Sequence, residues 1–199
     1  LALANRLVGN ALFAPALETT LTGVSVRFER DACAAVTGAR AKVLLNGERV
    51  KRHRTLSVAG GDELEIGPAK AGARNYLALA GGVDVDEVLD SASTYLPAGF
   101  GGFRGWALRA EDVLAVAPVD EAPARLKTPK DFRPPAGSSW ALRACYGAEV
   151  DLLDKESRFD LFDTNFSVGR RADRMGLQLE GARFAVKSGG RLASAPVFP

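Results

Sequence analysis

The stretch from Arg74 to Gly105 constrains the fold most, because it joins a run that is apolar on both faces to a glycine-rich loop. Residues 76–80 are apolar at successive positions, which is typical of a strand that is covered on both sides. Gly81 and Gly82 end that run, since paired glycines allow the positive φ angles that a sharp turn needs. Four of the seven residues from Gly99 to Gly105 are glycine. Such a loop is entropically costly, so either buried phenylalanines or a ligand close to bare backbone should hold it.

The rest of the first half of the chain consists of short apolar runs between turns. In residues 24–28 the apolar Val24, Val26 and Phe28 alternate with Ser25 and Arg27, as in a half-buried strand. Asn-Gly at positions 46 and 47 is a strong hairpin signal, because a type I′ turn needs positive φ at both central positions. We expect a helix over residues 1–8 and further strands in runs 16–21, 33–36, 42–45, 55–58, 64–66 and 113–116. The pattern predicts an all-β fold with a few short helices, arranged as a closed or nearly closed antiparallel barrel.

The second half of the chain begins after a proline-rich stretch. Five of the ten prolines lie between Pro118 and Pro135, which marks a linker or a domain boundary. We therefore expect a first β-barrel domain at 1–117, a linker at 118–139 and an incomplete second β-rich domain at 140–199. Within the second domain we expect strands at 140–146, 165–168 and 177–179 and a helix capped by Asp154 over 155–162.

Composition excludes several classes of protein. The net charge of +2 gives no reason to expect nucleic acid, membrane or strongly acidic partners. No apolar run approaches the ~20 residues of a membrane helix, and no signal peptide is visible. Cys33 and Cys145 form no CxxC motif, so a reduced, cytoplasmic setting is expected. Because the sequence starts at Leu1 and stops within an apolar pattern, we expect it to be part of a longer chain.

Two charged segments have a functional and a structural interpretation. The single histidine, His53, lies in the basic run 49–54, which is either an anion-binding edge or a solvated strand protected by charge from edge-to-edge pairing. We favour the solvated strand. The acidic run 84–90 does not match a calcium loop, since Leu89 and Tyr95 occupy the positions of the required Gly and Glu. We therefore expect a polar helical turn there and no metal site.

Hydroxyl and arginine side chains are the candidates for binding. Ser93, Thr94 and Tyr95 directly precede the glycine loop and either bind a carboxylate or phosphate or cap turns. Residues 170–176 contain three arginines, which either form an anion clamp with Asp173 as the orienting group or lie in a surface turn with one salt bridge. The glycine loop lacks the Gly-Lys-Ser/Thr ending of a P-loop and the spacing of a dinucleotide fingerprint.

Six ordered motifs together resemble the KipA-like family, also called allophanate hydrolase subunit 2, biotin-dependent carboxyltransferase or the C subunit of 5-oxoprolinase. The motifs are Ala4-Asn-Arg-Leu-Val-Gly-Asn10, Ala16-Leu-Glu-Thr-Thr-Leu21, Arg74-Asn-Tyr-Leu-Ala-Leu-Ala-Gly-Gly82, Ser93-Thr-Tyr-Leu96, Gly99-Phe-Gly-Gly102 and Asp173-Arg-Met-Gly176. The resemblance implies two cyclophilin-like β-barrels, the second incomplete in this chain. It also implies a KipI-like partner, the B subunit in 5-oxoprolinase, and the A subunit of that enzyme as a third component.

The resemblance implies a subunit of an ATP-dependent amide hydrolase, foremost 5-oxoprolinase, that needs its partners for activity and uses ATP at the level of the complex. Alternatives are an allophanate hydrolase or urea carboxylase-type carboxyltransferase component, with biotin held on another chain, and a non-catalytic KipA-type regulator that binds a KipI-like protein. No nucleophile or general base is identified. The expected substrate-binding residues are Arg74, Ser93, Thr94, Tyr95, Gly99, Gly101, Gly102, Asp173 and Arg174.

Overall fold

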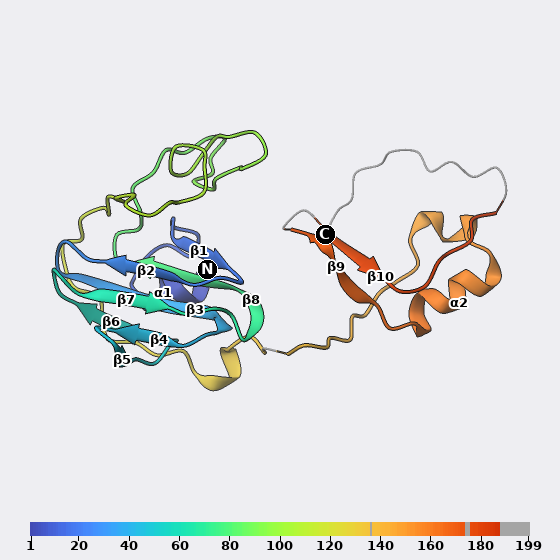
Figure 1. The fold of residues 1–199 in the computed structure, drawn as a ribbon, viewed down its shortest axis with the longest axis horizontal. Helices are drawn as coiled ribbons and strands as arrows, with labels where there is room; N and C mark the ends of the chain where they lie inside the picture. The colour runs from blue at the N-terminus through green and yellow to red at the C-terminus, as the bar shows by residue number, and fades with distance from the viewer. Residues whose placement is uncertain (136, 174–175, 188–199) are drawn as a thin grey trace. The chain divides into compact units, whose positions relative to one another are not determined.

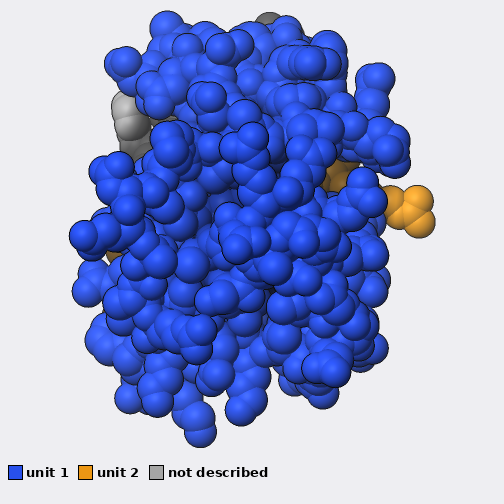
Figure 2. All heavy atoms as spheres, turned by 90° about the vertical axis from the view of Figure 1, so that its left-hand side faces the viewer, with its two compact units in different colours: residues 1–139 blue, residues 140–199 orange. Residues whose placement is uncertain are grey.

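The structure is a computed structural model that describes residues 1–135, 137–173 and 176–187. The chain divides into two compact units, residues 1–139 and 140–199, which Figure 2 shows in blue and orange. No helix in the described part of the chain has both the length and the apolar character needed to cross a membrane.

Unit 1 contains two four-stranded antiparallel sheets (Figure 1). The strand order is β1-β8-β3-β6 in the first sheet and β2-β7-β4-β5 in the second. The elements are α1 (Ala2–Leu7), β1 (Leu17–Thr20), β2 (Val24–Arg27), β3 (Ala32–Arg40), β4 (Val43–Leu45), β5 (Glu48–Arg49), β6 (Thr55–Val58), β7 (Glu63–Ile66) and β8 (Ala71–Leu79). The expected mainly β fold with few short helices is confirmed. Closure of these sheets into a barrel is not shown.

The main core lies between the two sheets. Val36 of β3 and Leu77 of β8 meet Leu64 and Ile66 of β7 there, and all four are at most 2% exposed. Successive residues of a strand point to opposite faces, so Ala78 and Ala35 lie on the outer face of the first sheet, where α1 covers them. Strand β8 is therefore buried on both faces, as its apolar run predicts.

The Asn-Gly turn forms as expected. Asn46 and Gly47 have φ angles of 51° and 80°, and Leu45 pairs with Glu48 across the turn. The side chain of Asn46 also donates a hydrogen bond of 2.7 Å to Asp62 in the neighbouring turn. Two left-handed residues match the right-handed twist of the flanking strands, and this explains why the sequence identifies this hairpin so directly.

The buried Asn5 and the half-buried Asn10 fix the end of β8. Asn5 is fully buried and donates hydrogen bonds to the carbonyl groups of Leu12 and Ala14, at 3.2 and 2.8 Å. Asn10 donates to Asn5 Oδ1 and to the carbonyl of Leu79, and accepts a bond of 2.9 Å from the amide of Gly81. Most of these bonds tie a loop carbonyl or amide that the sheet leaves unpaired. The network therefore sets the direction in which the chain leaves β8.

Several predicted elements are wrong. The acidic run 84–90 is not helical: it ends in a tight turn in which Val88 and Ser91 exchange backbone hydrogen bonds. Residues 113–116 form an isolated bridge between Val83 and Val116 instead of a strand. Residues 140–146 have no ladder partner among the described residues. In each case an apolar or charged pattern is present, but runs 84–90 and 113–116 form only isolated bridges, and a bridge does not extend into a regular element.

Unit 2 contains a short helical part and a hairpin. Its elements are η2 (Ala148–Leu152), α2 (Lys155–Asp163), β9 (Ser167–Ala172) and β10 (Leu177–Glu180). Asp154 caps α2, as expected, by accepting a hydrogen bond of 2.8 Å from the amide of Ser157. Strands β9 and β10 pair antiparallel. The domain limits expected at 117 and 139, and the cyclophilin-like character of both domains, stay predictions.

Candidate functional site

The glycine loop belongs to a lobe of residues 84–115 that extends beyond the end of β8 (Figure 1). Its two ends lie side by side, because Asp84 donates to the carbonyl of Ala115 and Ala117 donates to that of Gly82. Gly81 has a φ angle of 90°, and a Cβ atom there would lie 2.0 Å from the carbonyl oxygen of Ala117. Glycine is therefore required where the returning chain crosses the base of the lobe.

Inside the lobe the two glycines of the motif pack directly on the hydroxyl-bearing segment. A Cβ atom at Gly101 would lie 2.4 Å from the carbonyl oxygen of Ser93, and one at Gly102 would lie 2.1 Å from Thr94 Oγ1. Both glycines are buried and have positive φ. Close backbone packing is thus the reason that these two positions need glycine.

Backbone hydrogen bonds complete this arrangement. Tyr95 donates a bond of 2.8 Å to the carbonyl of Phe100, and Gly99 donates one of 3.0 Å to the carbonyl of Tyr95. The rings of Tyr95 and Phe100 lie 5.4 Å apart, centroid to centroid. Six of the expected residues therefore lie together in one lobe: Ser93, Thr94, Tyr95, Gly99, Gly101 and Gly102.

The surface of the lobe offers hydrogen-bond donors and cations. Ser93 is exposed and Tyr95 is 45% exposed, so both side chains are accessible to a ligand. The guanidinium group of Arg104 lies 5.0 Å from the ring centre of Phe103, and that of Arg109 lies 5.6 Å from the ring centre of Trp106. Sequence reasoning missed both arginines. The available signal was their spacing next to aromatic residues in the glycine-rich segment.

Arg74 is not drawn into this lobe. It lies near the start of β8, opposite Thr20, and its Nε atom lies 3.3 Å from a carboxylate oxygen of Glu18 on β1. Five residues of strand, or about 16 Å, separate it from Leu79, where the chain leaves the sheet. The ion pair of Arg74 with Glu18 therefore joins β8 to β1 and supports the sheet.

Asp173 and Arg174 belong to unit 2. The amide of Asp173 donates to the carbonyl of Gly176, and its carboxylate accepts a bond of 3.0 Å from the amide of Gly176. These bonds close the turn between β9 and β10. Arg174 lies outside the described residues, and the structure does not place Asp173 relative to the lobe of unit 1.

His53 contradicts the expectation of a solvated strand. It is 5% exposed and has a φ angle of 61°; its amide donates to Val36, and its carbonyl accepts from Thr128. The chain crosses from the second sheet to the first at this point, which buries the ring. Burial, and after it the charges of Arg52 and Arg133, lower the pKa of His53 to about 4. The imidazole is therefore neutral at pH 7.

Metal ligands are not gathered anywhere in the described ranges, because no group of three or more His, Cys, Asp or Glu side chains lies together. The lobe also does not fit a phosphate cradle of the P-loop type. Gly101 and Gly102 pack on Ser93 and Thr94, and no lysine follows the glycines. What the lobe can do chemically is to donate hydrogen bonds from hydroxyls on a closely packed backbone to a carbonyl or carboxylate oxygen.

Comparison with known proteins gives the wider relationship. The chain is 34% identical over 202 residues to the urea amidolyase of Lachancea kluyveri, covering 94% of this chain and 11% of that protein. It is 34% identical over 186 residues to the C subunit of 5-oxoprolinase from Escherichia coli, covering 91% of this chain and 57% of the relative. The solved urea carboxylase of Kluyveromyces lactis matches with a TM-score of 0.83 and 30% identity, over 93% of this chain and 17% of that one.

The chain thus spans between about a tenth and somewhat more than half of the length of these relatives. The profile of one protein family, described as "Carboxyltransferase domain, subdomain A and B", matches residues 1–199, which is the whole chain. The protein belongs to this carboxyltransferase-domain family.

Proposed function

We propose that this chain is part of the carbonyl-activating subunit of a heteromeric, ATP-dependent amide hydrolase of the 5-oxoprolinase type. The observation that carries the proposal is the match to the C subunit of 5-oxoprolinase, a separate polypeptide of which this chain covers 57% at 34% identity. Because that relative is one subunit of an enzyme, the match supports the presence of partner chains. The partners that we propose are a KipI-like B subunit and, as a third component, an A subunit.

The glycine lobe is the proposed site of carbonyl activation in this chain. An amide or lactam carbonyl is unreactive, and it is activated by donors that are held where negative charge develops on oxygen. The hydroxyls of Ser93 and Tyr95 belong to exposed side chains on a backbone that is fixed by the packing of Gly101 and Gly102. Because such donors are already held in place, little energy is needed to reorganise them in the transition state.

The binding of an anionic group is assigned to two arginines on the surface of the same lobe. Arg104 and Arg109 are exposed and lie over aromatic rings, and so present their guanidinium groups to an anionic group such as a substrate carboxylate. Asp173 and Arg174, which belong to unit 2, stay proposed binding residues, and Arg74 is proposed to support the first sheet of unit 1. Because the lobe does not fit a P-loop, ATP is proposed to be handled elsewhere in the complex.

Carboxyl transfer is the second candidate function. It is favoured by the 34% identity to a urea amidolyase over 94% of this chain. In this alternative the same donors orient the acceptor amide, while biotin is carried by another chain. The third alternative is a non-catalytic regulator that binds a KipI-like protein. It requires a binding surface for that partner but no catalytic turnover.

The decisive experiment uses the full-length protein that contains this chain, co-expressed with its KipI-like and third partner subunits. Release of glutamate from 5-oxoproline with ATP supports the hydrolase. Transfer of label from carboxybiotin to urea or another amide, without lactam opening, supports the carboxyltransferase. A stable complex with the KipI-like chain and no turnover of either kind supports the regulator.

Two conservative variants test the lobe within that assay. Ser93→Ala and Tyr95→Phe each remove one hydroxyl, and a donor aimed at a developing oxyanion is worth about 10²-fold in kcat. Ser138→Ala, an exposed serine of the proline-rich stretch, is the matched control and should leave turnover unchanged. Wild-type turnover in both lobe variants would remove these hydroxyls from the site.

A further inference from the structure

Strand β6 lies at the edge of the first sheet, and part of its outer edge is already covered by the protein's own chain. The amide of Thr55 donates a bond of 3.0 Å to the carbonyl of Leu126, and Arg54 and Lys127 form an antiparallel bridge. The amide of Thr128 donates to the carbonyl of His53. Over residues 53–55, this edge is therefore already paired with an extended segment of the same chain.

At Ser57, the remainder of that edge has no backbone partner among the residues that the structure describes. In the ladder with β3, the amide of Thr55 points outward to Leu126, and alternate residues of a strand point the same way. The amide and carbonyl of Ser57 therefore face outward. The antiparallel register would place Ala124 opposite Ser57, but the carbonyl of Ala124 lies 3.3 Å from Thr55 Oγ1 instead. The segment around Leu126 thus leaves the edge of β6 before it reaches Ser57.

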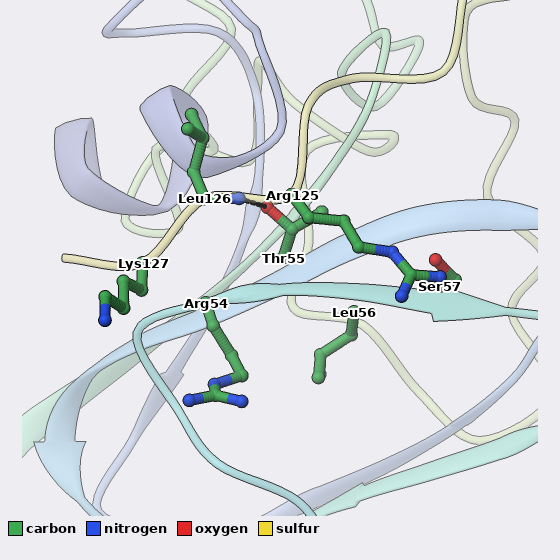
Figure 3. Close-up of a pocket in the computed structure, with 7 residues that line it drawn as sticks. All are labelled: Arg54, Thr55, Leu56, Ser57, Arg125, Leu126 and Lys127. Atoms are coloured by element: carbon green, nitrogen blue, oxygen red, sulfur yellow. Dashed lines mark hydrogen bonds between the residues drawn. The ribbon is translucent and has the colours of Figure 1, made fainter.

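A groove of about 510 Å³ lies where the two segments separate (Figure 3). Its lining residues are Arg54, Thr55, Leu56, Ser57, Arg125, Leu126 and Lys127. Figure 3 shows the side chain of Arg125 running along β6 towards Ser57. Three of the seven lining residues are cationic and none is acidic, so the groove offers positive charge beside free backbone donors and acceptors.

The positive charge is not neutralised within the described part of the chain. None of the three cations has an ion-pair partner there, and all three are exposed. Arg52 lies next to this edge, and its pKa is lowered by burial and then by the charges of Arg133 and Arg40, as expected where cations gather without carboxylates. A surface of one sign favours a partner of the opposite sign.

We propose that the open edge of β6 binds an extended, acidic segment of a partner protein. The segment adds a short strand at Ser57 and places its carboxylates on Arg54, Arg125 and Lys127. An extended segment fits because a strand can pair with both the outward amide and the outward carbonyl of Ser57. An acidic segment fits because the lining is cationic. The proposal concerns binding and is independent of the reaction that the complex catalyses.

The test measures peptide binding to the full-length protein by fluorescence anisotropy. The probe is a labelled peptide of alternating Glu and Thr, about twelve residues long, which is acidic and able to form a strand. A peptide of the same length and charge, in which Pro-Pro alternates with Glu-Glu, lacks backbone donors on both of its edges and therefore pairs poorly as a strand. We expect the Glu-Thr peptide to bind and the Glu-Pro peptide to bind at least about tenfold more weakly.

Substitutions separate the charge from the backbone contribution. Arg125→Glu combined with Lys127→Glu should abolish binding, while Arg30→Glu, which reverses an exposed cation outside the groove, should not. Ser57→Pro removes an outward amide that β3 does not use and should weaken binding at least about fivefold, whereas Ser57→Thr should not.

Three results would overturn the proposal. They are no binding of the Glu-Thr peptide at low salt, equal binding of the two peptides, and binding that survives the double charge reversal. The charge-reversal variants keep the test decisive if Ser57→Pro fails to fold, because the reversed side chains are exposed.

Discussion

Neutral His53 should make the stability of the protein fall in mild acid. Its pKa is about 4 in the folded protein, against an ordinary value of 6.5, because burial and the neighbouring Arg52 and Arg133 disfavour the charged ring. Below pH 6.5 the unfolded chain binds a proton that the folded protein does not bind. The free energy of unfolding therefore decreases as the pH falls from about 6.5 to about 4, and this contribution is constant below pH 4.

The size of the effect follows from the two pKa values. The separation of the pKa values sets an upper limit of about 3 kcal/mol, of which about 2 kcal/mol is lost between pH 7 and pH 5. His53→Asn is the matched variant, since asparagine does not titrate in this range and tolerates the left-handed backbone at φ 61°. The wild-type protein and the variant contain the same carboxylates, so the titration of these groups cancels in the comparison.

Urea unfolding followed by far-ultraviolet circular dichroism provides the measurement. The wild-type protein should lose about 2 kcal/mol more than His53→Asn on going from pH 7 to pH 5. An equal loss in the two proteins would show that the ring is protonated as readily in the folded state as in the unfolded state. That result would refute the inference that burial and cations hold His53 neutral.

Three further predictions concern the elements that position the lobe. Asn10→Ala removes the bonds to the end of β8 and should lower the free energy of unfolding by about 2–3 kcal/mol in urea titrations. Gly81→Ala places a Cβ atom 2.0 Å from a backbone oxygen and should lower the melting temperature far more than Gly47→Ala, which meets open space. Gly102→Ala should increase amide exchange in the lobe without moving the urea midpoint, and Thr94→Ala in the same chain should partly reverse this.

Each of these predictions has a contradicting result. Wild-type stability of the Asn10 variant would mean that water replaces its hydrogen bonds. Equal melting temperatures of the two glycine variants would mean that the collision at Gly81 is relieved by movement of the returning chain. Unchanged exchange in the Gly102 variant would remove the packing on Thr94 as the reason for glycine at that position.

Prediction from sequence succeeded where one local interaction decides the structure. The Asn46-Gly47 hairpin depends on two positive φ angles, and the cap of α2 depends on one carboxylate and one amide. The doubly apolar run before Gly81 is equally local, because it fits only a strand that is covered on both sides. In all three cases the residues that carry the signal also make the contact.

Prediction failed where partners come from distant parts of the chain. His53 lies in a basic run, but the crossing between the sheets and the segment around Thr128 bury its ring. The acidic run 84–90 has the charge pattern of a polar helical turn, but Asp84 donates a hydrogen bond to the carbonyl of Ala115 and Asp86 forms a backbone bridge with Gly102. Charge and hydropathy patterns carry no information on such long-range pairing.

By itself, the sequence determined the β class, the hairpin and the presence of a glycine loop after a buried strand, because backbone freedom and alternation are properties of neighbouring residues. The tertiary structure decided which atoms of Ser93 and Thr94 the glycines pack against and that Arg74 pairs with Glu18 within the sheet. It also decided that the edge of β6 at Ser57 lies beside cations with no ion-pair partner among the described residues. The physical reason is that close approach and unpaired charge exist only between segments that the folded chain brings together.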